Sequence, residues 1–156
     1  MDIVILRPLT TPLSRVAVPL LLAACCLAGC ETQPVALRDS RDVISGHVLD
    51  QPINAAKSME EGGKVVVTRD SGWVGSGGLL KIIVDGIPVA KLSRYERYEV
   101  LLKEGDHLLG VVPNANPFGV SVHEASVSVK TGQTYYFRVG LDSSNSLIIQ
   151  RSAFTK

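Results

Sequence analysis

The sequence has no excess of charge of either sign. Its 156 residues carry 16 basic and 15 acidic side chains, and the formal net charge is +1. A protein that binds nucleic acid needs a basic face that neutralises phosphates. The composition therefore predicts no nucleic-acid partner. The length is that of one ordinary domain.

The sequence also has few of the patterns that carry catalysis or hold metals. The three histidines, His47, His107 and His123, are not spaced as a pair on one strand face or helix turn. Gly75-Ser76-Gly77 lacks the spacing of a Gly-x-Ser-x-Gly nucleophile elbow. We therefore expect no catalytic residue, no metal site and no cofactor. His107 directly follows a tight turn, where we expect it to hydrogen-bond the backbone.

Cysteine is scarce, and the position of each one is informative. Cys25 and Cys26 lie inside an uncharged apolar run, residues 16–28, and Cys30 follows that run. Arg15 precedes the run and supplies the positive flank of a secretory signal. As a helix, these residues would cover about 20 Å, which is short of the ~30 Å hydrocarbon core of a bilayer. The pattern therefore predicts a cleaved signal peptide and not a permanent membrane helix.

The end of the run, Leu27-Ala28-Gly29-Cys30, resembles a bacterial lipobox. At such a site a lipoprotein precursor is acylated on the cysteine and cut just before it. The resemblance implies a signal peptide over residues 1–29 and a lipid anchor on Cys30 in the bacterial cell envelope. Glu31 stands where an aspartate would imply retention in the inner membrane, so the resemblance implies the periplasmic face of the outer membrane. An acylated Cys30 leaves the mature chain without a thiol for a disulfide or a metal.

Residues 30–63 have frequent charges, scattered prolines and glycines and no persistent hydrophobic period. One interpretation is a lipidated N-terminus followed by a flexible tether, and some thirty flexible residues reach about 30 Å. The other is that part of this segment packs on the domain. A short helix over residues 50–59 and a short extra strand within residues 43–49 are both open.

Residues 64–156 consist of short apolar runs cut by turn signals. Val65-Val66-Val67-Thr68 is a β-branched run, typical of a strand covered on both faces. Asp85-Gly86 favours positive φ at both positions and predicts a tight hairpin. Pro88 cannot donate to a ladder, so the returning strand is expected at an edge. The whole segment predicts an all-β fold, an antiparallel two-sheet sandwich of about seven strands.

Two further positions in this segment carry local predictions. The alternation of apolar residues changes phase at His123-Glu124, which predicts a β-bulge. Lys103-Glu104-Gly105-Asp106 predicts a turn.

Two loops hold aromatic residues that are candidates for binding. The glycine-rich stretch 72–78 contains Trp73, the only tryptophan, and Phe118 lies in a loop dense in turn formers. An exposed loop aromatic is a common anchor for a protein partner or a sugar ring. Alternatively, Trp73 folds back and caps one end of the sandwich. If both loops lie at one end, Trp73 and Phe118 would form a recognition patch.

Several segments together resemble a family of bacterial envelope domains, domain of unknown function 2846. The match covers about residues 64–151 and rests on four ordered segments: 64–69, 84–89 with Leu92, 105–108 and 132–139. The chain departs from the pattern at Lys103-Glu104, where a proline often precedes the glycine of a hairpin turn. The resemblance implies a transthyretin-like or immunoglobulin-like sandwich. It implies no activity and transfers no site residues.

These observations favour a lipid-anchored bacterial envelope protein that acts as a non-catalytic interaction or accessory module. The expected partners are the membrane, through the lipid on Cys30, and an envelope protein or a glycan. A glycan-binding module that uses Trp73 is the alternative function. A small hydrolase is a third and less favoured one.

Overall fold

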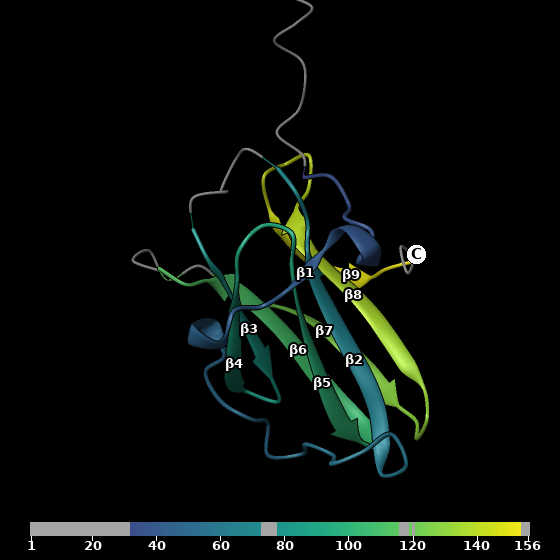
Figure 1. Ribbon diagram of the computed structural model, residues 1–156. Helices are drawn as coiled ribbons and strands as arrows, with labels where there is room; N and C mark the ends of the chain where they lie inside the picture. Colours follow the sequence, from purple (N-terminus) through teal and green to yellow (C-terminus); the bar gives the residue numbers. More distant parts are fainter. Residues whose placement is uncertain (1–31, 73–77, 116–118, 120, 154–156) are drawn as a thin grey trace, which may run out of the picture.

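Two β-sheets packed face to face form the protein (Figure 1). The computed structural model describes residues 32–72, 78–115, 119 and 121–153. The first sheet contains, in spatial order, β1 (Arg41–Asp42), β5 (Glu96–Lys103), β2 (Gly62–Arg69), β8 (Thr134–Leu141) and β9 (Leu147–Arg151). The second contains β4 (Ile87–Leu92), β3 (Leu80–Val84), β6 (Gly105–Pro113) and β7 (His123–Val129). The predicted all-β, two-sheet sandwich is confirmed, with nine strands in the described ranges.

The strand directions differ in part from the prediction of antiparallel sheets. Within the described residues, β2–β8 and β1–β5 are the parallel pairs, and the other neighbours run antiparallel. Parallel partners cannot be joined by a tight turn, so the chain passes through other strands between them. Between β2 and β8 it builds the whole second sheet and β5.

The core lies between the sheets and consists of inward side chains from both. Val65 and Val67 of β2 are fully buried, and Phe137 of β8 is only 1% exposed. Val66 and Thr68, on the other face of β2, are buried as well. The prediction that this β-branched run is covered on both faces is therefore confirmed. No helix in the described part of the chain is long and apolar enough to cross a membrane.

The hairpin of β3 and β4 forms as predicted. Asp85 and Gly86 have φ values of 49° and 81°, and β4 lies at the edge of its sheet. The register shifts between Ile82 and Ile83, so Ile82 faces Ala90 and Ile83 faces Pro88. The irregularity therefore falls beside the proline, in an edge strand where a lost ladder bond costs little.

The β-bulge predicted at His123-Glu124 is absent. β7 begins at His123, and it pairs with β6 without a register shift from His123 to Val129. The change of phase in the sequence therefore marks the start of the strand. The turn predicted at Lys103–Asp106 joins the two sheets and is not a hairpin, because β5 pairs with β2 whereas β6 pairs with β3 and β7.

The segment before β2 packs on the sandwich from Thr32 onward, as the second interpretation of residues 30–63 proposed. Isolated bridges join Gln33 to Ser71, Val48 to Ala90 and Ala55 to Leu102. The bridge to Ala90 lies along the edge strand β4, and the bridge to Leu102 lies along β5 beyond the two-residue strand β1, so both cover backbone groups that would otherwise be open to other chains. Residues 50–59 form turns and a bridge, so the structure does not contain the short helix that the sequence left open there.

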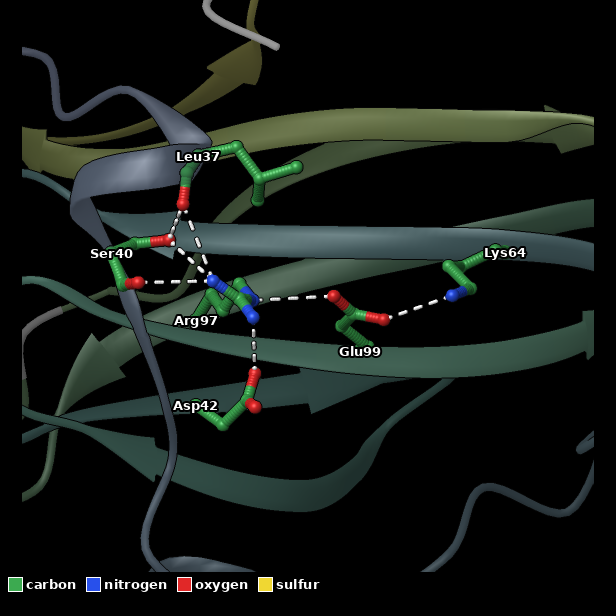
Figure 2. Close-up of polar contacts among 6 residues, drawn as sticks. All are labelled: Leu37, Ser40, Asp42, Lys64, Arg97 and Glu99. Carbon is green, nitrogen blue, oxygen red and sulfur yellow. Dashed lines mark hydrogen bonds and ion pairs between the residues drawn. The ribbon is translucent and has the colours of Figure 1, made fainter. Parts of the chain in front are cut away.

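One arginine on β5 holds much of this segment. Arg97 Nη1 donates to the carbonyl oxygens of Leu37 and Ser40, at 3.3 and 3.0 Å, and to Ser40 Oγ at 3.1 Å. Its Nη2 lies 2.8 Å from Asp42 Oδ1, and its Nε donates to Glu99, which also binds Lys64 (Figure 2). A planar guanidinium suits such divided contacts. Residues 37–42 are thus fixed beside β5, and Arg41–Asp42 form the edge strand of the first sheet.

Candidate binding site at one end of the sandwich

An open cavity of about 390 Å³ lies at the end of the sandwich where β2, β6 and β8 end and β3, β7 and β9 begin. This end is uppermost in Figure 1. The volume falls within the usual range of small-molecule sites. Apolar groups of Leu79, Leu80, Pro113, Leu141 and Leu147 contribute to the wall. Its polar side chains include Thr32, Arg69, Asp70, Arg94 and His123. We call this region the cavity end.

A buried carboxyl joins three distant parts of the chain at this end. Asp70 Oδ2 accepts hydrogen bonds from Arg138 Nη1 at 2.8 Å and from Thr32 Oγ1 at 3.3 Å. Asp70 Oδ1 is buried without a hydrogen-bond partner in the described residues. Burial raises the pKa of Asp70 to about 6, although Arg138 and Thr32 act to lower it. The carboxyl therefore changes charge close to neutral pH.

A glycine on β8 makes room for these groups. A Cβ atom on Gly140 would lie 2.6 Å from Asp70 Oδ2 and still closer to the Thr32 hydroxyl. Real Cβ atoms essentially never approach another heavy atom so closely, so the close approach of Thr32 and Asp70 to β8 requires a residue without a side chain. The sequence signal for this contact is a single glycine inside an otherwise alternating strand.

Two arginines hold the ends of the loop that carries Trp73. Arg69 Nη1 donates to the carbonyl oxygens of Gly78 and Leu92, both at 2.6 Å. Arg94 Nη1 donates to the carbonyl oxygen of Gly72 at 3.2 Å. Burial lowers the pKa of Arg69, and the nearby charge of Arg94 adds to that effect. Two cations therefore lie close together in the wall, and both are tied to backbone.

The three residues singled out from the sequence, Cys30, Trp73 and Phe118, lie outside the described residues. Their neighbours in the chain are described. Gly72 and Gly78 bracket Trp73, Pro113 and His123 bracket Phe118, and all four line the cavity. The described flanks of both predicted recognition loops thus meet at one end. Sequence reasoning did not find Arg69 and Asp70, although a charged pair directly after a buried β-branched run is a usable signal of a strand end.

His107 contacts the backbone and an aspartate. His107 Nε2 lies 2.9 Å from the carbonyl oxygen of Lys103, which confirms the predicted backbone contact. His107 Nδ1 also lies 2.7 Å from Asp85 Oδ2, a contact the sequence did not indicate. This pair is at the opposite end from the cavity, beside the β3–β4 turn. The described part of the chain contains no group of three His, Cys, Asp or Glu residues that could hold a metal ion.

No family model matches the chain, and no curated protein matches it. The resemblance to domain of unknown function 2846 therefore stays an expectation.

Proposed function

We propose that this chain is a lipid-anchored bacterial envelope protein whose sandwich is a non-catalytic interaction module, with its binding surface at the cavity end. One observation carries the proposal. Four polar side chains of the cavity wall are hydrogen-bonded to other parts of the protein, and they border a mostly apolar hollow: Thr32, Arg69, Asp70 and Arg94.

A catalytic group must be able to reach a substrate and exchange a proton or a bond with it. Asp70 is held by Arg138 and Thr32, and both arginines of the wall donate to backbone carbonyls. Groups held in this way shape a surface and position loops. A concave apolar site with a few fixed polar groups is the usual form of a binding pocket.

The anchor is tested by changing Cys30 in the full-length precursor. We expect the wild-type protein to sediment with membranes and to incorporate labelled palmitate, whereas Cys30→Ser does neither. Cys26→Ser is the matched control, because this cysteine belongs to the expected signal peptide and should leave both readouts unchanged. Membrane association and palmitate labelling of Cys30→Ser would contradict the anchor.

A glycan is the second candidate ligand, and it is favoured by the meeting of both loop flanks at the cavity. Trp73 is the only tryptophan, so tryptophan fluorescence reports on this one residue. We would titrate a protein that begins at Glu31, without the expected signal peptide and lipid, with peptidoglycan fragments and oligosaccharides. Saturable quenching would support glycan binding. An unchanged signal, together with a specific envelope protein crosslinked at the cavity end, would support a protein partner.

A further inference from the structure

We propose that the lipid anchor holds the cavity end of the sandwich directly against the membrane surface, with no spacer between the lipid and the domain. The proposal rests on the acylation of Cys30 and deepens the function proposed above. Its partner is the bilayer itself.

The covalent chain sets the distance. Cys30 and Thr32 are two residues apart, and two extended residues span at most about 7 Å. Thr32 lines the cavity and is only 7% exposed. Whatever conformation the two connecting peptides adopt, the acylated residue lies within about 7 Å of the cavity wall.

Thr32 is fixed by several bonds. Its backbone N–H donates to the carbonyl oxygen of Leu141 at 3.1 Å, and its hydroxyl donates to the same oxygen at 3.0 Å. The hydroxyl also accepts from the Leu141 N–H at 2.9 Å and contacts Asp70. The anchor point is therefore tied to the end of β8 and, through Asp70, to the end of β2.

The next residues continue the attachment. Gln33 and Ser71 exchange two backbone hydrogen bonds of 3.0 Å each, and Ser71 Oγ donates to the Gln33 carbonyl oxygen at 3.1 Å. Val35 is buried. Further along, Arg97 holds residues 37–42 on β5 (Figure 2). Freeing a tether would require the loss of all these contacts together.

The consequence is a fixed orientation. A flexible tether of some thirty residues would let the domain rotate about 30 Å from the lipid. With only Glu31 between Cys30 and Thr32, the described C-terminal ends of β2, β6 and β8 lie at the membrane surface. The opposite end, with the turns at Asp85-Gly86 and Thr131-Gly132, faces away from it. Any ligand of the cavity then binds at the level of the lipid headgroups.

The test uses two variants of the acylated protein, each with one fluorophore, at the cavity end in one and at the opposite end in the other. Both are placed in phosphatidylcholine liposomes that contain a lipid with a spin label on its headgroup. Acylation of Cys30 and loss of the signal peptide remove every native thiol, so a single introduced cysteine is labelled. Ser146→Cys reports on the cavity end, where Ser146 is exposed and lines the cavity. Lys130→Cys reports on the opposite end from an equally exposed position after β7.

We expect the label at residue 146 to be quenched at least threefold more strongly than the label at residue 130. A 20-residue Gly/Ser insertion between Glu31 and Thr32 adds a reach of roughly 25 Å and should remove the difference. Equal quenching at both positions without the insertion would overturn the proposal. A difference that survives the insertion would also overturn it, because the short connection would not be its cause.

Failure of the anchor itself is recognisable in the same experiment. A protein without acyl chains would not float with the liposomes, and its free Cys30 would take up fluorophore in a chain with no introduced cysteine. That result would reject the acylation of Cys30. An anchored protein with equal quenching rejects only the orientation.

Discussion

The two ends of this sandwich are built differently. At the end away from the cavity, β3 joins β4 and β5 joins β6 through one or two residues, and backbone and side-chain bonds close the gaps. Gly132 N–H donates to the carbonyl oxygens of Met59 and Gly62, and His107 contacts both Asp85 and Lys103. At the cavity end, longer connections leave β2, β6 and β8 around an open hollow.

Each end contains a hydrogen-bonded aspartate, and the two have opposite pKa shifts. Burial raises the pKa of Asp85, but hydrogen bonds from His107, Leu108 N–H and Asn54 outweigh burial and leave it below 3.8. For Asp70 burial prevails, and the pKa is about 6. The side chain of Asp85 is 21% exposed and that of Asp70 is 0% exposed. At the end away from the cavity, which we call the closed end, hydrogen bonds thus stabilise the ionised form of Asp85. At the cavity end, burial disfavours the ionised form of Asp70, as it does for carboxyl groups in many binding sites.

The largest predicted effect is a dependence of the unfolding free energy on pH that is due to Asp70. The folded-state pKa of Asp70 exceeds its unfolded value, so its stabilising contribution is complete below about pH 4 and is lost as pH rises through about 6. The loss amounts to roughly 3 kcal/mol in the free energy of unfolding. Urea unfolding of wild type and Asp70→Asn at pH 4–7 should show that dependence in the wild type alone.

Asp85→Asn is the control from the closed end. The depressed folded-state pKa of Asp85 gives a contribution that is present above its unfolded pKa and is lost as pH falls through the lower folded-state value. The difference in unfolding free energy between wild type and Asp85→Asn should therefore shrink on acidification below about pH 4. If the difference in unfolding free energy from wild type changed with pH in the same direction for Asp70→Asn and Asp85→Asn, the contrast between the two ends would be wrong.

Local signals in the sequence predicted the parts of this molecule that local forces determine. Asp85-Gly86 adopts the positive φ values that its hairpin needs, and Pro88 lies in an edge strand. The parallel pairing of β2 with β8 could not be predicted, because the partner strand lies beyond the whole second sheet. The helical spacing of residues 50–59 was outweighed by pairing of Ala55 with Leu102.

The candidate site shows the same division. The sequence directed attention to Trp73 and Phe118 because aromatic residues in glycine-rich loops are visible in any sequence. Asp70 was missed because its partners Thr32 and Arg138 are 38 and 68 residues away. Only the fold brings these three side chains together.

A second, smaller effect separates the glycines of the two ends. Gly140 at the cavity end lacks space for a Cβ, so Gly140→Ala should cost about 2 kcal/mol of unfolding free energy, and the larger Asn should cost more. Gly132 at the closed end has open space but a φ of 75°. There Ala should cost about 1 kcal/mol and Asn less, because Asn tolerates the left-handed region.

Chemical denaturation of the four glycine variants provides the measurement. The order of Ala and Asn should reverse between positions 140 and 132. If Asn were milder than Ala at position 140, backbone conformation and not space would govern that site. The close contact of Thr32 and Asp70 with β8 would then lose its support.

The smallest predicted effect concerns Trp73, whose described neighbours Gly72 and Gly78 line the cavity. Trp73→Ala should change the unfolding free energy by less than about 0.5 kcal/mol, as is usual for an exposed side chain. The described ends of its loop are held by Arg69 and Arg94 through the backbone of Gly78 and Gly72, and those bonds do not need the indole.

Phe137→Ala is the contrasting control, since Phe137 is 1% exposed and its truncation should cost about 3–5 kcal/mol. A loss of that size for Trp73→Ala, measured by urea unfolding, would place the indole in the core and remove it from the recognition patch. A near-neutral result would keep Trp73 as a candidate for ligand binding.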